Sequence, residues 1–456
     1  MKRPVPSFPL GLDGKGRIIP PRMRALPTML LATAAVAADP LTLVLPQTVH
    51  QPVGATTALR GGATYALGSE AAATWYNPAM AASLDPEQLS AGATAYGFNN
   101  ITVSAGRDSD ALLSGAVLKV YGGFSGRSPD GDVGWTAMLC NPMHWSGAVD
   151  SGRTEPTPTQ RSYATQVRVD QDTWSGQLAV GWNPVEGVQL GGALVGNYDS
   201  VDLIQSVWIR DYQGRYVAES FTSSAWSASL QLKLGASIQP IERLSLGLSL
   251  VTPGVELMSG GLSNTAGSTV DPVGSTASSF NARVDEDAFR FVHAWQLGLG
   301  AGWQEPGWDA ELDLVWTMPD AAHETVPALS GFTSTTSGAT TTLTPLLIPP
   351  RVTTYRHVVN ARIGGSVVLS ERMTLHVGAF TDYSPIAESD LYNKIDFYGL
   401  SGGIMFRRGE TGLILGTSAT WGDERISLYD PATATVQPGD LSVFAMDVLI
   451  GTVSKF

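Results

Sequence analysis

Side chains that catalyse reactions or bind metal ions are sparse in this sequence, and their spacing fits no common catalytic or metal-binding motif. None of the six histidines (His50, His144, His293, His323, His357 and His376) stands at a metal-ligand spacing from another. Cys140 is the single cysteine, which excludes an intrachain disulfide and metal sites built from cysteine clusters. His144 and Ser146 are too close in sequence to suggest a Ser-His catalytic pair, and no phosphate-binding glycine loop with a lysine is present. We expect a protein that is not an enzyme and that uses no metal or cofactor.

Two cations, Lys233 and Arg362, lie in stretches where apolar and polar residues alternate. Lys233 alternates with leucines, and Arg362 is followed by Ile363. Alternation places successive side chains on opposite faces of a β-strand, so both cations would lie on a polar face. The chemistry available to them is charge pairing. The partner is either the carboxylate of a ligand held beside an apolar surface, or Glu311 or Asp313 on a neighbouring strand.

The elements that carry these cations belong to a long series of predicted strands. Every second residue is apolar in Ser229–Gln239, and the same alternation holds in Leu244–Leu250, Trp295–Trp303 and Ala310–Trp316. Applied to the whole chain, the pattern predicts about fourteen strands. Their ranges are 88–98, 111–121, 132–140, 173–182, 187–199, 222–238, 241–251, 290–303, 308–317, 353–369, 372–382, 395–407, 411–421 and 441–456.

The two faces of these strands favour a membrane barrel over a soluble sandwich, which would also alternate. One face is rich in Leu, and the other carries Gly, Ser and charged residues that suit a polar lumen. Aromatic residues near the strand ends would form girdles: Trp182, Trp295, Trp303, Trp316, Tyr398 and Trp421. Short connections alternate with long ones (141–172, 200–221, 252–289, 318–352, 383–394 and 422–440), as in outer-membrane barrels. We therefore predict an all-β fold, a transmembrane antiparallel β-barrel.

Composition and the N-terminus agree with a secreted membrane protein. Charged residues are 15% of the chain, against about 25% in soluble proteins, and no apolar run beyond the N-terminus is long enough for a transmembrane helix. Residues 1–38 are predicted to be a signal peptide, with Met23 a candidate for the true start. Removal of this segment changes the net charge from −13 to −18, because it takes away six basic residues and one acidic residue. So acidic a chain is a poor nucleic-acid binder.

The stretch Leu59–Leu84 is rich in Gly and Ala, and Arg60 and Glu70 are its only charged residues. We predict that it packs as a plug inside the barrel. Glycines on the polar strand faces, such as Gly298 and Gly300, would make room for it, or would permit bulges and kinks. The predicted division of the mature chain is an N-terminal periplasmic and plug segment over 39–87, and a barrel over 88–456.

The plug stretch also carries a family resemblance. Its run Ala71–Ala79, with an aromatic pair before Asn-Pro-Ala, resembles the hatch of the long-chain fatty acid transporter (FadL/OmpP1/TodX-type) family of outer-membrane proteins. Phe380–Ile386 and Asp396–Gly403 are similar to the C-terminal strands of that family and their connecting loop. Met80 departs from the pattern, since a glycine is common at that position.

The resemblance implies a barrel of fourteen strands in the outer membrane of a Gram-negative-type bacterium, with a hatch closing its lumen. It implies passive uptake of long-chain fatty acids or other hydrophobic compounds, which pass between hatch and barrel wall, and a monomeric protein. The candidate site residues are the hatch motif Asn77, Pro78 and Ala79, and the ligand-lining residues Trp75, Tyr76, Lys233 and Arg362.

Two other functions fit the same sequence. Hatch segments that look much the same occur in PorV-type barrels, which act as attachment or shuttle partners in secretion, and a structural role belongs to the same class. A nonspecific porin is the third reading, although a closed hatch should suppress its conductance. For Trp75 and Tyr76, packing of the hatch itself is the alternative to ligand contact.

Overall fold

The part of the chain that the computed structural model describes is 52–456, apart from 106–107, 115–118, 154–161, 286–288, 320–322, 390 and 431–434. These residues all belong to one structural unit, Leu41–Phe456. The predicted signal peptide and start site lie outside the described residues and stay predictions. No helix among the described residues is long and apolar enough to cross a membrane.

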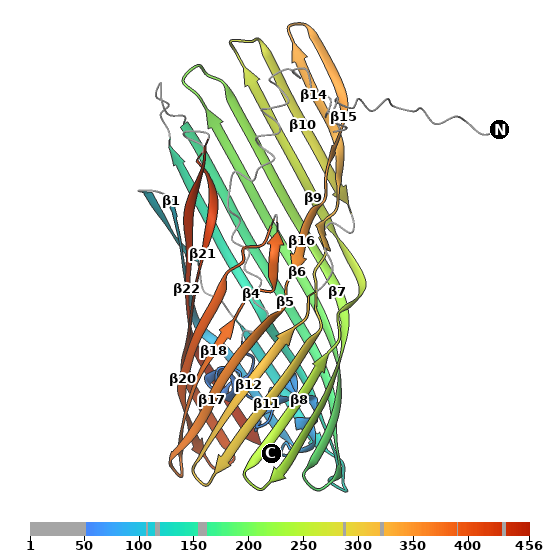
Figure 1. Ribbon diagram of the computed structural model, residues 1–456, viewed down its shortest axis with the longest axis vertical. Coiled ribbons are helices and arrows are strands. Elements are labelled where there is room, and N and C mark those ends of the chain that lie inside the picture. Colours follow the sequence, from blue (N-terminus) through green and yellow to red (C-terminus); the bar gives the residue numbers. More distant parts are fainter. Residues whose placement is uncertain are drawn as a thin grey trace, which may run out of the picture. The chain divides into compact units, whose positions relative to one another are not determined.

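Fourteen antiparallel strand positions close into a barrel, which confirms the predicted fold (Figure 1). Around the ring they are β1 (Gln88–Ala105), β2 (Asp108–Ser114) with β3 (Val120–Arg127), β4 (Val133–Arg153), β5 (Ser162–Val185), β6 (Val188–Arg210), β7 (Tyr216–Ile241), β8 (Leu244–Val251), β11 (Gln296–Glu305), β12 (Trp308–Thr317), β17 (Val358–Ser370), β18 (Met373–Asp382), β20 (Asp396–Arg408), β21 (Thr411–Asp430) and β22 (Thr435–Lys455). The last strand pairs with the first, so that Gln88 lies opposite Lys455. Closure leaves the ring without a free edge.

The alternation in the sequence corresponds to an inner and an outer face of the wall. Leu232 and Leu234 of β7 are 44% and 47% exposed on the outside, whereas Lys233 between them is 5% exposed. Outward aromatic residues recur eight positions apart on β12, at Trp308 and Trp316. Eight residues of a strand tilted by about 40° rise roughly 20 Å, close to the ~25 Å apolar band of membrane barrels. We call the aromatic residues at the end of the barrel with the long connections the outer aromatic band.

Several strands continue well beyond this band as a tall sheet. β7 pairs in its lower part with β8 and in its upper part with β9 (Val255–Asp271). The sheet then runs through β10 (Thr276–Asp285) and β14 (Leu329–Ser337) to β15 (Thr340–Ile348), at the upper right of Figure 1. A small separate sheet contains β13 (His323–Val326), β16 (Arg351–Tyr355) and β19 (Ile386–Ser389). The stretches 252–289 and 318–352, which we expected to be long connections, therefore hold much of this sheet.

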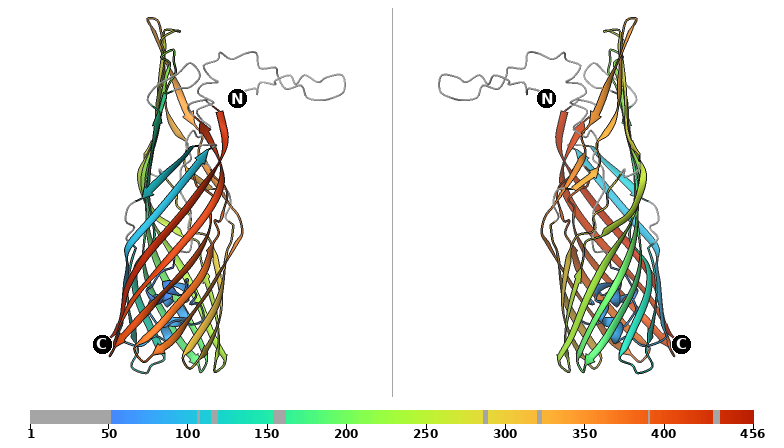
Figure 2. Two further views of the ribbon diagram at one scale, coloured as in Figure 1. Left: turned by 90° about the vertical axis from the view of Figure 1, so that its left-hand side faces the viewer. Right: turned by 90° about the vertical axis from the view of Figure 1, so that its right-hand side faces the viewer.

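The residues before β1 lie inside the barrel, where Figure 2 shows them in blue near the end with the short turns. We call residues 52–87 the inner segment. It has only three short helices, α2 (Thr56–Leu59), α3 (Ala73–Tyr76) and the 3₁₀ helix η1 (Pro78–Ala82). Its core is made of alanines and other small residues with almost no exposed surface, so that the chain fits into a narrow bore.

Glycines on the inner faces of the strands allow the inner segment to pack directly against the wall. A Cβ atom at Gly298 would overlap the ring of Tyr65, and one at Gly302 would overlap the side chain of Leu67. A Cβ at Gly300 would lie 2.6 Å from the Tyr65 Cβ and 3.0 Å from the Ala66 nitrogen. Of the two explanations for these glycines, close packing with the inner segment is the one that these contacts support.

Candidate ligand cavity in the lumen

Carboxylates of the barrel wall bind the backbone of the inner segment. Thr64–Leu67 lies outside α2, α3 and η1, so no helix supplies partners for its N–H groups. Glu311 and Asp313, on the inner face of β12, accept hydrogen bonds from the four successive N–H groups of Thr64–Leu67 at 2.6–3.2 Å. Arg60 balances part of this charge, because its guanidinium lies 3.0 Å from Asp309 and 3.3 Å from Glu311. Glu311 and Asp313 therefore hold the inner segment in place against β12.

Asn77, which is fully buried, connects two parts of the inner segment to the wall. Its Oδ1 accepts the N–H of Ala79 at 3.1 Å and caps η1, with Pro78 at the first helical position, where a missing N–H costs nothing. Its Nδ2 donates to the carbonyls of Tyr65, at 2.7 Å, and of Ala236 on β7, at 3.0 Å. Asn77 of the Asn-Pro-Ala motif thus joins two parts of the inner segment to the barrel wall.

Above the inner segment lies a cavity of about 160 Å³, and all four predicted ligand-lining residues contribute to it. Trp75 and Tyr76, with Tyr65, come from the inner segment, while Lys233 projects from β7 and Arg362 from β17. We call this space the luminal cavity. The structure therefore brings together residues that are up to 287 positions apart in the sequence, as Trp75 and Arg362 are.

The two cations lie over the aromatic rings rather than against carboxylates. The Lys233 Nζ is 3.5 Å from the centre of the Trp75 ring and donates to the Trp75 carbonyl at 2.9 Å. The Arg362 guanidinium carbon is 5.2 Å from the Tyr76 ring centre. Within the described part of the chain, neither cation makes an ion pair, although Arg362 lies directly opposite Asp313 in the pairing of β12 with β17.

The remaining lining of the luminal cavity divides into polar and apolar parts. The polar part, on the inner faces of β5, β6 and β7, consists of Gln171, Thr173, Ser175, Asn197, Asp199 and Gln231. The apolar part comes from the segments above and includes Phe291, Val292, Tyr355 and Tyr392. Such a site suits a ligand with a polar, anionic end and an apolar body.

An ion pair that the sequence analysis missed also lines this cavity. The Nε2 of His293 lies 2.8 Å from an oxygen of Asp199, whose other oxygen accepts from Thr173 at 2.7 Å. Burial alone would lower the pKa of His293, but the charge and hydrogen bond of Asp199 outweigh it and raise the pKa. His293 belongs to the coil before β11, and nothing in its local sequence indicates that this coil folds into the lumen.

A second, smaller cavity of about 60 Å³ lies between the inner segment and the wall. We call it the wall cavity. Its lining comes from Pro52–Ala55 and Ala58 of the inner segment and from β1, β3, β4, β18, β21 and β22, with Asn141 among the residues of β4. Pro142 contacts both this cavity and the luminal cavity, so the two spaces adjoin at that residue.

Strand pairing is irregular where the wall cavity meets the barrel. The pairing of β1 with β22 shifts between Thr94 and Tyr96, and that of β4 with β5 shifts between Cys140 and Met143. Between them, β1 pairs with β3 over one part of its length and with β2 over another. The Lys119 Nζ lies 3.0 Å from Asp447 on the inside of this region.

A buried apolar cluster lies next to the luminal cavity and shares Tyr355 and Tyr392 with its lining. It joins the upper inner faces of the strands to residues outside the barrel strands. Representative members are Val169, Leu203, Phe289, Leu391 and Tyr392. At the opposite end, a cavity of about 830 Å³ below the inner segment contains Ala66 and Leu67 in its lining. The segment around Tyr65–Leu67 thus separates the luminal cavity from this lower mouth.

Comparison with solved structures identifies the same fold elsewhere. The P. putida toluene transporter TodX matches with a TM-score of 0.61 at 13% identity, over 89% of this chain and 99% of that one. A Pseudomonas aeruginosa FadL homologue matches with a TM-score of 0.60 at 13% identity, over 91% and 100% of the two chains.

The monoaromatic hydrocarbon channel CymD matches with a TM-score of 0.55 at 15% identity, over 90% of this chain and 99% of that one. No family profile matches the sequence. No curated protein matches it either. The resemblance found in the sequence is confirmed by these structures, and the chain has the barrel fold of FadL-type hydrophobic-compound channels.

Proposed function

We propose that the protein is an outer-membrane channel for passive uptake of hydrophobic compounds that carry an anionic end, with long-chain fatty acids as the leading candidates. The observation that carries this proposal is the pair of buried cations, Lys233 and Arg362, which lie over an aromatic floor and have no ion-pair partner within the described part of the chain. A ligand carboxylate would supply that partner, and the apolar residues above would hold its chain. The names of TodX and CymD refer to toluene and monoaromatic hydrocarbons, so an aromatic body is the second candidate.

The inner segment acts as the hatch in this proposal. A ligand enters past the apolar cluster at the outer end and binds in the luminal cavity. It moves past Pro142 into the wall cavity and leaves sideways into the bilayer, where strand pairing is irregular. The hydrogen bonds of Glu311, Asp313 and Asn77 support a hatch that stays in place during this passage.

The protein then acts in the outer membrane as a monomer, after removal of residues 1–38, with the lipid bilayer and the ligand as its partners. Neither catalysis nor nucleic-acid binding is part of the proposal. Similarity in fold to channels supports a transport role, and the acidic composition is unsuited to phosphate backbones.

The first experiment is native mass spectrometry, with lipid extraction, of the detergent-purified barrel. We expect a co-purified fatty acid or another acidic amphiphile. Titration with a long-chain fatty acid and with the matching fatty alcohol then tests the role of charge. Lys233→Gln and Arg362→Gln should each weaken binding of the acid about tenfold or more and leave the alcohol unchanged.

Arg243→Gln is the matched control, because Arg243 is an exposed cation that pairs with Glu305 at 2.6 Å, away from the cavity. Equal loss of acid and alcohol binding in the cavity variants would show that their effect is structural. Failure of wild-type protein to bind either compound would overturn the proposal.

A role as an interaction partner is the second candidate, and the tall sheet favours it. Phe332, Leu343 and Leu347 on β14 and β15 are 57%, 64% and 71% exposed. If the purified barrel carries a stoichiometric protein partner and no ligand, this function replaces the first.

A further inference from the structure

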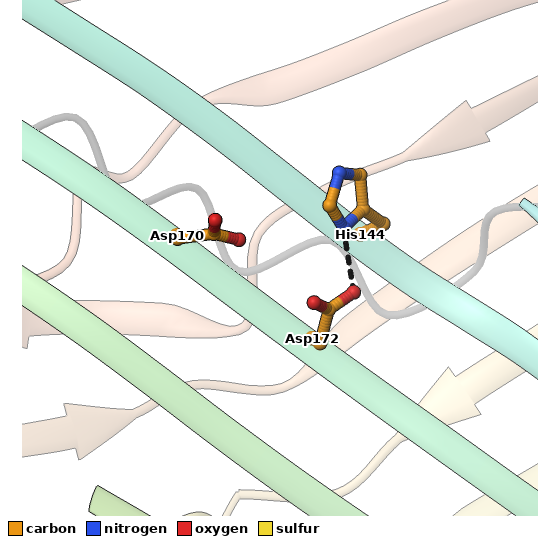
Figure 3. Close-up of side chains that lie close together, drawn as sticks. All are labelled: His144, Asp170 and Asp172. Carbon is orange, nitrogen blue, oxygen red and sulfur yellow. Dashed lines mark hydrogen bonds and ion pairs between the residues drawn. The ribbon is translucent and has the colours of Figure 1, made fainter. Parts of the chain in front are cut away.

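A cluster of metal-ligating side chains lies on the outside of the barrel, away from the lumen. His144 on β4 faces Asp172 on β5, and Asp170 is the next outward residue along β5 (Figure 3). Their sequence neighbours Gln171 and Thr173 point inward and line the luminal cavity, so the three side chains occupy the opposite face.

The height of the cluster places it at the level of the lipid headgroups. Asp172 precedes Trp174 by two residues, and Trp174 is an outward-facing residue of the outer aromatic band, 38% exposed. Aromatic girdles mark the boundary between the apolar core and the headgroups. The cluster is therefore outside the apolar part of the membrane, where ions are available.

The distances within the cluster are compatible with a single bound ion. His144 Nδ1 is 2.6 Å from Asp172 Oδ1, and one ligand atom from each of the three residues lies within 4.8 Å of the others. Zinc takes imidazole nitrogen and carboxylate oxygen at about 2.0–2.2 Å, which separates tetrahedral ligands by about 3.3–3.6 Å. The distance of 2.6 Å between His144 and Asp172 is shorter than this separation, so a bound ion would replace their direct contact.

Asn141 supplies a second, independent observation. Its side chain is 4% exposed, and its Nδ2 lies 3.1 Å from the same Asp172 oxygen that contacts His144. Its Oδ1 is buried and has no hydrogen-bond partner within the described part of the chain. A buried polar atom without a partner is costly. Because an amide can be turned by 180°, Oδ1 can take the position of Nδ2 and face a cation at the cluster, while Nδ2 then takes the place of Oδ1 beside the wall cavity, which Asn141 also lines.

We propose that His144, Asp170 and Asp172, with Asn141 as a further ligand, bind one divalent transition metal ion, with zinc as the representative. An imidazole among oxygen ligands favours zinc over magnesium and calcium, which prefer oxygen alone. The bound ion would join β4 to β5 beside the shift in pairing between Cys140 and Met143, and would stiffen the wall there.

The test uses the full-length mature barrel in detergent, without an affinity tag and stripped of metal by a chelator. Calorimetric titration with zinc should give one ion per chain, and magnesium and calcium should bind at least about tenfold more weakly. His144→Ala and Asp172→Asn should each weaken zinc binding by about tenfold or more. Cobalt in place of zinc should give a visible absorption spectrum that His144→Ala changes.

His357→Ala is the matched control, since His357 is exposed and stacks on Trp316 of the outer aromatic band. It should leave zinc binding unchanged, and heat-modified mobility on gels shows that each variant is folded. Zinc binding that survives His144→Ala, or that equals calcium binding, would overturn the proposal. Absence of a stoichiometric zinc site would also overturn it. His144 and Asp172 would then form only a surface ion pair, with Asp170 beside it.

Discussion

Asn77 forms more side-chain hydrogen bonds than any other residue of the Asn-Pro-Ala motif. Its replacement should weaken the attachment of the inner segment to the barrel wall. Asn77→Ala removes the cap of η1, worth about 1 kcal/mol, and leaves the buried Tyr65 carbonyl without this donor, at about 1–3 kcal/mol. It also removes the bond to the Ala236 carbonyl, a residue that stays paired with both neighbouring strands. We expect a fall in thermal stability and a measurable rise in conductance in planar bilayers, because the inner segment lies in the bore and would be held there less firmly.

Asn183→Ala is the control for this prediction. Asn183 donates a single bond of 3.2 Å to the Ala82 carbonyl near the lower mouth. It should cost about 1 kcal/mol and leave conductance at the wild-type level. Equal effects of the two variants would mean that Asn77 has no special role in this attachment.

The ion pair of His293 and Asp199 gives a pH dependence with a definite sign. The folded-state pKa of His293 is raised above its ordinary value of 6.5, because Asp199 outweighs the opposing effects of burial and of Lys233. A raised pKa means that the pair stabilises the fold fully below pH 6.5 and that this contribution is lost as the pH rises through the raised value. The coil 289–295 should therefore be held less firmly at pH 9 than at pH 6.

Hydrogen exchange of the amides in 289–295, corrected for the intrinsic pH effect, measures this loss. His293→Gln should reduce protection at both pH values and abolish the difference between them. His357→Gln should behave like wild type. Protection that is independent of pH in the wild-type protein would contradict the assignment of a charged pair.

At the scale of the element, the inward glycines of β11 define how close the hatch lies to the wall. Gly300→Ala would place a methyl group 2.5 Å from Oδ1 of Asp313, which binds the inner segment, 2.6 Å from the Tyr65 Cβ and 3.0 Å from the Ala66 nitrogen. Overpacking of this kind costs about 1–3 kcal/mol. We expect a lower temperature of unfolding together with increased protease cleavage near Tyr65 from the periplasmic side.

Gly196→Ala on β6 is the matched control, because a Cβ there would meet nothing within 4 Å. It should be neutral or slightly stabilising, since glycine is unfavourable inside a strand. If Gly300→Ala and Gly196→Ala change the unfolding temperature and the protease cleavage equally, the inward glycines serve strand flexibility and not packing against the inner segment.

The wall strands could be predicted from the sequence because one face of each meets lipid and the other the lumen, as at Leu232, Lys233 and Leu234. This difference between an apolar and a polar strand face is lost above the outer aromatic band. There, both faces of β9, β10, β14 and β15 meet water or other protein. Their Ser/Thr-rich sequences then resemble loops. The length of β5, β6 and β7 was underestimated for the same reason.

At the scale of the whole molecule, strand alternation was enough to place Lys233 and Arg362 in the lumen, and the aromatic pair beside Asn77 could be placed in the segment that packs inside the barrel. The carboxylates that hold the hatch, and the pairing of His293 with Asp199, could not be predicted. Each depends on how a coil or a strand from a distant part of the chain enters the bore, and no local pattern encodes that approach.

The wall cavity adjoins the luminal cavity, and the lower mouth lies beneath the floor of the luminal cavity. Each would give the ligand a different exit, and bulky substitutions can distinguish the two. Thr94 is 2% exposed and lines the wall cavity, whereas Ser245 lines the lower mouth. Thr94→Phe should fill the wall cavity, which is only about 60 Å³, and reduce uptake of a radiolabelled fatty acid while binding in the luminal cavity persists. Ser245→Phe narrows the lower mouth and should leave uptake unchanged, because the proposed route leaves through the wall. The reverse pattern, with uptake lost in Ser245→Phe and retained in Thr94→Phe, would show that ligands pass the segment around Tyr65–Leu67 to the periplasm, and that the hatch bound by Glu311 and Asp313 must move.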